Sequence, residues 1–326
     1  MNNNDVKIFI GYYKPTTLFK SDILIPLHCG RAVVGEKSKC GKLNKSWIKW
    51  LKTNTVGDDT GDNISKYNRY LNEMTGIYWM WKHQQDFGNP AYIGFMQYAK
   101  HFLFDSKIKL PDSRWVPEYE GYLFDTDTYV KTNNLSNDNI LKVIADNDCV
   151  CPNKINLLRS ASVKTCRQQM DILSKGYGYV FDIMVKVVET KYPQYKKYLN
   201  EIKNGCEHYP LNCFIMKKDL FNKYCEFVFG VLLEVMKESH LENANIYQKR
   251  APGYCAEFLT SMFISSLRDK KIKTCKMCIL YQDNEKEYAN IQFKKIYKYI
   301  LSINKENHRH YIKIFGMKLF IEKRKF

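Results

Sequence analysis

The sequence predicts an α/β fold in which a mixed, mostly parallel sheet is covered by helices. Short, nearly continuous apolar runs, which are typical of covered strands, alternate along the chain with stretches whose apolar residues recur at helical spacing. Apolar residues make up 45% of the chain and charged residues 26%, which is ordinary globular usage and excludes a disordered or collagen-like protein. The longest uncharged stretches are far shorter than the roughly 20 apolar residues of a membrane span.

Four segments have the character of strands. Residues 6–13 alternate apolar residues with others and end before Pro15, which predicts a first strand that leads into a loop. Residues 90–97 are almost continuously apolar, as in the middle of a covered sheet. Two further short strands are predicted at Cys149–Pro152 and Cys213–Met216.

Three helices are predicted from apolar periodicity. The first follows the turn-forming residues 57–63 and begins near Asp62 or Ser65, either of which can act as its N-cap. The second begins at Asp219, a good N-cap, and the third extends from Tyr254 through Leu267. The apolar positions of the first helix are Ile64, Tyr67, Leu71, Met74, Tyr78 and Trp81, and those of the second are Leu220, Tyr224, Phe227, Val231 and Val235.

Positive charge is concentrated in two stretches. The chain carries a net charge of +17, and residues 286–326 hold eleven Lys or Arg and three Glu. Residues 37–52 hold six Lys and no acid. The pattern changes after about residue 285, where Phe293, Ile296, Ile300 and Ile303 are spaced as in a helix among lysines. We therefore divide the chain into a main domain, 1–285, and a basic amphipathic C-terminal segment, 286–326, which is either a solvated helix or, as we favour, an adhesion element for anionic lipid.

The cysteines and the N-terminus indicate a cytosolic protein. The N-terminus lacks the positive region and apolar run of a secretory signal. Eleven cysteines, an odd number, are then expected to be reduced thiols. The pairs Cys149 with Cys151 and Cys275 with Cys278 each supply only two of the four ligands that zinc requires, so no metal is assigned to them.

The residues from Gly57 to Lys66 (GDDTGDNISK), followed by Asn68, Glu73, Thr75 and YWMWK at 78–82, carry the most specific pattern of the chain. This pattern resembles a family of bacterial capsular and exopolysaccharide glycosyltransferases long filed as a domain of unknown function. Similar blocks follow in the family's order at 212–217, 224–226 and 247–257. Two departures stand out: Tyr67 replaces a lysine of the first block, and 97–101 reads QYAKH where the family has a strand ending in His-Tyr-Arg-Arg.

The resemblance implies a GT-A-like domain that transfers a sugar from a nucleotide donor, with UDP expected, to a polyprenyl-linked glycan or a growing surface polysaccharide such as capsule, lipopolysaccharide or exopolysaccharide. Together with the basic segment 286–326, this leads us to expect a peripheral location on the inner face of the cytoplasmic membrane, with an anionic membrane surface and no specific nucleic acid as partner. It leaves open whether the reaction inverts or retains the anomeric configuration.

Such a reaction requires cations for the departing diphosphate and a base for the acceptor hydroxyl. We expect Glu257 to be the general base, since it lies near a helix start and seven residues after Arg250. The alternative is a helix-start carboxylate with no catalytic part. The residues expected to bind the donor or its diphosphate are Asp62, Asn63, Lys66, Asn68, Tyr98, Lys100, His101 and Arg250.

A divalent cation is a second way to neutralise the diphosphate. Asp125 and Asp127, two residues apart, could hold Mg²⁺ or Mn²⁺, although a solvated turn is the interpretation we favour. The alternative is a metal-independent reaction served by basic side chains alone. Trp79 and Trp81 are expected to pack in the core, and Glu73 is either a solvated charge or a site residue.

Two other functions fit parts of the sequence. The charge of +17 and the aromatic residues among the lysines would suit a non-catalytic protein that binds nucleic acid or membranes. Asp125, Asp127 and the pair Asp58 and Asp59 would suit a metal-dependent phosphoesterase. The ordered set of family blocks favours the transferase over both.

Overall fold

The computed structural model describes residues 2–104, 135–281, 301–306, 309–314 and 317–321. The chain forms two compact units, residues 1–281 and 282–326. Asp125, Asp127 and the segment 286–300 therefore lie outside the described residues. In the parts that are described, no helix is long and apolar enough to cross a bilayer.

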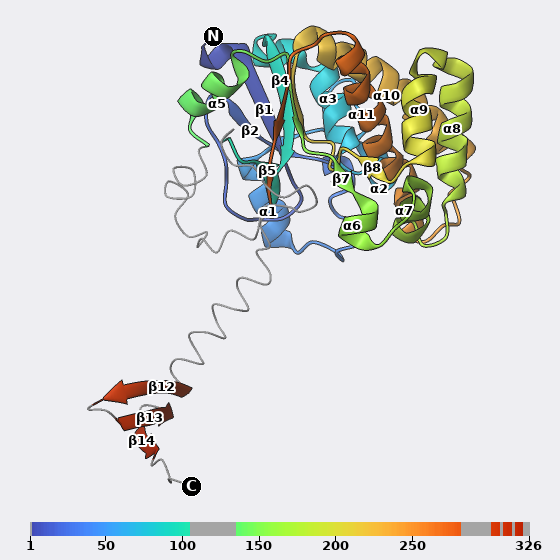
Figure 1. The fold of residues 1–326 in the computed structure, drawn as a ribbon. Helices are drawn as coiled ribbons and strands as arrows, with labels where there is room; N and C mark the ends of the chain where they lie inside the picture. The colour runs from blue at the N-terminus through green and yellow to red at the C-terminus, as the bar shows by residue number, and fades with distance from the viewer. Residues whose placement is uncertain (1, 105–134, 282–300, 307–308, 315–316, 322–326) are drawn as a thin grey trace. The chain divides into compact units, whose positions relative to one another are not determined.

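The first unit is built on a mixed, mostly parallel sheet (Figure 1). Strand β1 pairs in parallel with β2 and β4, β2 with β3, and β6 with β10, while β9 runs antiparallel between β4 and β6. The predicted fold class is confirmed. The strands in sheet order are β10 (Thr274–Met277), β6 (Cys149–Pro152), β9 (Phe214–Lys217), β4 (Tyr92–Gln97), β1 (Val6–Tyr12), β2 (Leu24–His28) and β3 (Val56–Gly57), with β5 (Lys100–Phe102) and β11 (Ile279–Tyr281) attached beyond β4.

Both faces of this sheet are covered, so successive residues of its strands belong to different cores. Ile8 and Ile10 of β1 pack in one core and Phe9 in the other. Figure 1 shows α3, α10 and α11 on one face and α5 near the other. The helices are α1 (Lys45–Asn54), α2 (Asn68–Leu71), α3 (Met74–Lys82), α5 (Asn137–Ile144), α6 (Leu157–Ala161), α7 (Cys166–Leu173), α8 (Tyr179–Lys191), α9 (Lys196–Asn204), α10 (Lys218–Glu238) and α11 (Ala251–Asp269), and two short strands, β7 (Ile155–Asn156) and β8 (Glu207–His208), pair with each other.

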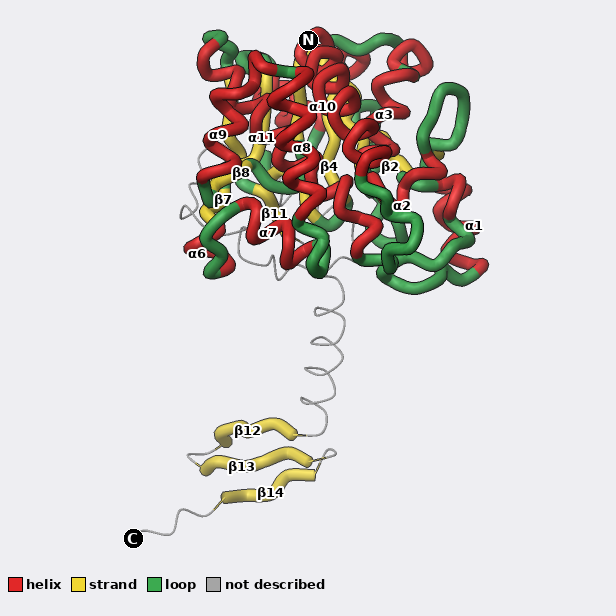
Figure 2. The backbone as a smooth tube through the Cα atoms, turned by 90° about the vertical axis from the view of Figure 1, so that its right-hand side faces the viewer, coloured by secondary structure: helices red, strands yellow, loops and turns green. Residues whose placement is uncertain are grey.

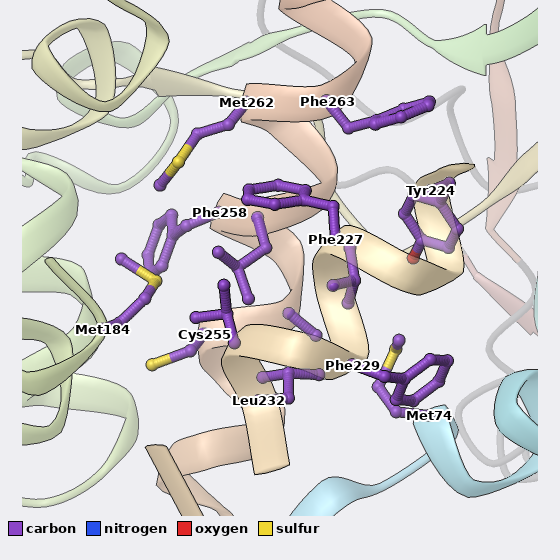
Figure 3. Close-up of a cluster of buried hydrophobic side chains, with 14 of the residues drawn as sticks. Met74, Met184, Tyr224, Phe227, Phe229, Leu232, Cys255, Phe258, Met262 and Phe263 are labelled. Carbon is purple, nitrogen blue, oxygen red and sulfur yellow. The ribbon is translucent and has the colours of Figure 1, made fainter. Parts of the chain in front are cut away.

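Helices α10 and α11 form the centre of the larger core (Figure 3). Phe227 and Leu232 of α10 meet Cys255, Phe258 and Met262 of α11 there, and all five are buried. Burying a side chain of the size of Leu or Phe stabilises a fold by about 1.5–3 kcal/mol. This core fixes the position of the first turns of α11, which carry Arg250 and Glu257 at and after the helix start.

The prediction of one continuous first helix is wrong. The chain instead forms a 3₁₀ turn, η3 (Ser65–Tyr67), then α2 and α3, with a break at Asn72, whose φ is 53°. The apolar spacing continues across the break because all three segments pack on one core, and periodicity reports the buried face rather than the backbone conformation.

The predicted helix caps also differ from those observed. Ser65 donates its hydroxyl to Asp58, and Asp62 is exposed, so neither caps α3. Lys217 occupies the N-cap of α10. Asp219 lies within the first turn, where its negative charge interacts favourably with the positive end of the helix macrodipole.

The second unit contains a three-stranded antiparallel sheet of β12 (Leu301–Glu306), β13 (Arg309–Ile314) and β14 (Met317–Ile321), seen in Figure 2. Ile303, the last member of the helical spacing expected here, lies in β12 opposite Ile312. The other three members of that spacing lie outside the described residues.

Candidate active site

A cleft of about 520 Å³ lies at the carboxyl ends of three neighbouring parallel strands. Its floor comes from Gly11–Tyr13 at the end of β1, His28–Gly30 at the end of β2, and 97–100 between the end of β4 and the start of β5. The facing wall comes from α2 with the break that follows it and from the start of α11. In open α/β sheets this edge is where ligands bind, since loops from several strands converge there.

A buried carboxylate sets the geometry of the cleft's edge. Asp58 follows β3, is fully buried, and accepts hydrogen bonds from the backbone N–H groups of Gly30 (2.7 Å) and Arg31 (3.0 Å). It also accepts from the hydroxyls of Ser65 (2.5 Å) and Thr75 (2.7 Å). These four bonds tie the end of β2 to η3 and α3. Both oxygens are thereby occupied by protein donors, which argues against the metal-ligand role that the phosphoesterase alternative gives to Asp58.

Glu257 of α11 and Glu73 are two of the three carboxylates that line the cleft, and the third is Glu36. Burial, together with the nearby charge of Glu73, raises the pKa of Glu257 to about 7, although Lys100 and the backbone N–H of Leu211 act in the opposite direction. The side-chain amide of Asn212 donates to Glu73 at 2.8 Å. A carboxyl group with a pKa near neutrality can take a proton from a hydroxyl at physiological pH.

The segment that holds this carboxylate pair has an unusual backbone. Leu211 and Asn212 both have positive φ, 76° and 50°, which costs on the order of 1–3 kcal/mol for each such residue. Asn212 is fully buried and accepts from the Thr260 hydroxyl at 2.9 Å, and Thr260 in turn bonds Tyr224 at 3.0 Å. This buried chain of hydrogen bonds stabilises the conformation that presents Leu211 to Glu257 and Asn212 to Glu73.

Four cations converge on the same cleft: Lys39, Arg69, Lys100 and Arg250. Desolvation lowers the pKa of Lys39, and the nearby charges of Arg250 and Lys100 lower it further. Desolvation also lowers the pKa of Arg69; the nearby charge of Glu36 acts in the opposite direction, and that of Arg250 lowers it further. Like charges brought this close repel one another, and a ligand with several negative charges would relieve that repulsion.

An aromatic stack borders the cleft on the β1 side. The ring of Tyr98 is stacked on Tyr12, with centroids 5.4 Å apart, and Tyr13 tilts against its edge at the same distance. Tyr13 is 48% exposed. Its ring offers a surface on which a base or a sugar could lie.

The cleft brings together five of the residues expected from the sequence to act in catalysis or donor binding. They come from three separate parts of the chain and are Asn68, Tyr98, Lys100, Arg250 and Glu257. Asn68 donates to the backbone oxygen of Asn72 at 2.7 Å and so supports the break after α2.

Three other expected residues lie away from the cleft, because the helix N-terminus that was to present them does not form. Asp62 accepts from the Tyr78 hydroxyl at 3.1 Å and is exposed. Asn63 accepts from the backbone N–H of Ser65 and closes a turn. The Lys66 amine lies 5.0 Å from the ring centroid of Tyr67, outside the cleft lining.

His101 is fully buried in β5, with its ring against Phe19, and does not line the cleft. Burial lowers its pKa to about 4, so the imidazole is neutral at physiological pH. It therefore cannot supply the positive charge that a diphosphate requires.

The expected metal pair, Asp125 and Asp127, falls outside the described residues. Among the residues that the structure does describe, no group of three or more His, Cys, Asp or Glu could hold a metal ion. Trp79 is buried and donates to Thr60, and Trp81 is partly buried and stacked on Phe229 against the core, so both pack as the sequence predicts.

Sequence reasoning missed Lys39, Arg69 and Tyr13. Lys39 is one of six lysines in 37–52, and no local pattern distinguishes it from the others. Arg69 lies beside Asn68 in the family block, so the block itself could have pointed to it. Tyr13 ends the first predicted strand, at the edge where ligands bind, and that position was the available signal.

Comparison with known proteins gives two findings. The model of a family described as a domain of unknown function, DUF4422, matches residues 7–271. A solved structure titled as the apo form of the bifunctional glycosyltransferase WbbM matches with 27% identity and a TM-score of 0.72. The match covers 86% of this chain and 46% of that one, so this chain spans less than half of the protein it resembles. A search of curated proteins finds no match.

Proposed function

The chain belongs to the family described as domain of unknown function DUF4422, and from this premise we propose that it is a glycosyltransferase with a nucleoside-diphosphate sugar as donor. The similarity to a glycosyltransferase structure supports glycosyl transfer in general. One observation carries the proposal further: four cations and a carboxyl group with a pKa of about 7 face one cleft at the carboxyl edge of the sheet.

The cations would act on the leaving group. When the glycosidic bond breaks, negative charge builds on the diphosphate, and positive groups placed in advance stabilise it. Lys39, Lys100 and Arg250 are the groups we assign to this task, with UDP as the expected nucleotide. Tyr13 would support the base or the sugar.

Glu257 would act on the other substrate. As general base it accepts the proton of the acceptor hydroxyl while the hydroxyl oxygen attacks the anomeric carbon and the diphosphate leaves. One base is sufficient for a single inverting displacement, which is the course we propose. Glu73 accepts a hydrogen bond from Asn212, and its charge raises the pKa of Glu257. The higher pKa makes Glu257 a stronger base for the proton of the acceptor hydroxyl.

The acceptor we propose is a polyprenyl-linked glycan or a growing surface polysaccharide. Such an acceptor lies at the cytoplasmic membrane, and the eight net positive charges of residues 286–326 would attract its anionic lipid. A divalent ion held by Asp125 and Asp127 would assist the cations, while a metal-independent reaction would rely on them alone.

Donor binding tests this function directly. UDP or a UDP-sugar at about a hundredfold excess over its Kd is expected to raise the Tm of the protein by about 5 °C. The Tm is measured with and without Mn²⁺. The variant Arg250→Gln should bind about tenfold more weakly, because a charged contact to phosphate is lost. Arg159→Gln, which removes an exposed arginine of α6, serves as the control. Salt-sensitive binding of random oligonucleotides, with no Tm shift from any nucleotide sugar, would instead support the nucleic-acid alternative.

Deleting residues 286–326 is expected to weaken co-sedimentation with phosphatidylglycerol vesicles at low salt by about tenfold or more, since each lysine or arginine near such a surface contributes about 1 kcal/mol. The measurement compares the bound fraction of the full and truncated chains at equal concentration. Equal bound fractions would contradict the adhesion role of the segment.

A further inference from the structure

Seven large apolar side chains of the described residues are exposed, and two of them, Tyr13 and Leu173, line the cleft. Four of them are Ile172, Leu173, Tyr179 and Tyr247, which are 57%, 42%, 40% and 38% exposed. We call these four the apolar rim. Side chains of this kind scattered singly need no explanation, whereas a group beside one opening marks a contact surface.

The apolar rim is a fixed part of the fold. Its two chain segments, the end of α7 with the start of α8 and the loop before Arg250, are held together by polar contacts. The amine of Lys175 lies 3.8 Å from the ring centroid of Tyr247. The Tyr179 hydroxyl donates to the backbone oxygen of Ser239 at 2.8 Å. Leu173 belongs to the rim and also lines the cleft, so the rim reaches its mouth.

Helix α1 provides a basic counterpart. Lys45, Lys49 and Lys52 are exposed on it, Trp47 is 39% exposed, and Leu51 is its buried residue. The six-lysine stretch, 37–52, which overlaps α1, also supplies Lys39 to the cleft. Figures 1 and 2, which view the molecule from directions 90° apart, both place α1, α6 and α7 at the same end of the first unit.

We propose that this end of the first unit docks on an anionic lipid bilayer, with the apolar rim inserted among the lipid chains and α1 against the headgroups. The combination of exposed branched apolar side chains, a tryptophan and lysines without an intervening acid matches the chemistry of that interface. Docking would place the cleft mouth at headgroup level. That this position would give the cleft access to a lipid-linked acceptor rests on the proposed function, whereas the docking itself does not.

Charge complementarity favours lipid over a protein partner. Residues 37–52 carry six positive charges and no negative one. Each lysine that lies near an anionic leaflet contributes about 1 kcal/mol of attraction. On the rim, Arg167 lies 3.7 Å from Asp171 and 3.0 Å from Asp182, so its single positive charge offsets only part of the two negative charges. Glu242 is exposed near Tyr179 and Lys175 lies over the ring of Tyr247, so the rim itself adds no net attraction, and the attraction to an anionic surface comes from residues 37–52.

The test uses the full chain and vesicles of phosphatidylglycerol and phosphatidylcholine in equal parts, with co-sedimentation as readout. The double variant Ile172→Ser with Tyr247→Ser should lower the partition coefficient about tenfold or more, because two apolar side chains no longer enter the bilayer. The variant Ile172→Leu with Tyr247→Trp, which keeps the apolar character, should bind as the wild type does. The Tm without ligand verifies that each variant is folded.

A second pair of variants tests the basic counterpart. Changing Lys45, Lys49 and Lys52 to Gln should lower binding about tenfold and weaken its dependence on salt. The matched control changes Lys191, Lys196 and Lys223 to Gln, which removes the same charge from the ends of α8, α9 and α10 at the amino edge of the sheet.

Unchanged partitioning of the Ser variant would overturn the proposal, as would equal losses from the two lysine triples. A change in oligomeric state of the Ser variant, with vesicle binding intact, would overturn it in favour of a contact between copies of the chain. None of these readouts involves a nucleotide sugar, so failure of the docking and failure of the proposed function are distinguishable.

Discussion

Glu257→Gln is expected to lower kcat by about 10²–10⁴, because the variant keeps the shape of the side chain but cannot accept the proton of the acceptor hydroxyl. Donor binding should change little, since the diphosphate is assigned to Lys39, Lys100 and Arg250. The measurements are single-turnover transfer and the Tm shift given by the donor. Wild-type turnover in this variant would remove Glu257 from the role of base, and a lost donor shift would show that it serves binding instead.

The same carboxyl group predicts a pH dependence. Because a general base acts only when ionised and the pKa of Glu257 is raised to about 7, kcat/KM should rise as the pH increases through 7. Stability should move the other way. The native pKa exceeds the unfolded value near 4.5, so the folded state loses stability as the pH rises from about 4.5 to 7.

Glu257→Gln should therefore be more stable than the wild type at pH 8, by about 1–3 kcal/mol, since it avoids the cost of a buried charge beside Glu73. The difference should disappear below pH 4.5, where Glu257 is protonated in both states. Urea unfolding at pH 4.5 and pH 8 measures both ends of this window. A variant that is less stable than the wild type at pH 8 would contradict the origin we give to the raised pKa.

Asp58→Asn is expected to lower the free energy of unfolding by about 3–5 kcal/mol. The four groups that bond Asp58 are all donors, and an amide nitrogen in place of one oxygen would face two of them. The neighbouring Asp59→Asn supplies a matched control, because Asp59 is exposed and its change should cost less than about 0.5 kcal/mol. Urea unfolding at pH 7 compares the two.

Equal, small effects of the Asp58 and Asp59 variants would show that the four hydrogen bonds do not hold the edge of the cleft. A large loss in Asp58→Asn should also weaken donor binding in the fraction that stays folded, since Gly30 lines the cleft and its position depends on Asp58. Stability and donor affinity are therefore measured on the same protein.

The sequence was sufficient for the fold class and for the strands that form the centre of the sheet. Residues 6–13, 90–97 and 149–152 form strands whose two faces are both covered. Such strands need apolar residues on both faces, and runs of apolar residues can be recognised in the sequence alone. The break at Asn72 was not visible, because an apolar stripe continues across a change in backbone direction whenever both pieces pack on one core.

The sequence by itself therefore determined the layered α/β architecture and the excess of positive charge, and it predicted Glu257, Lys100 and Arg250 as candidate site residues. Only the tertiary structure decided that Lys39 and Arg69 join them, that His101 is buried and neutral, and that Asp62, Asn63 and Lys66 lie elsewhere. The physical reason is that the tendency of a residue to be buried depends on its type, which can be read at each position of the sequence. The distance between two charges depends on how segments far apart in the chain pack together.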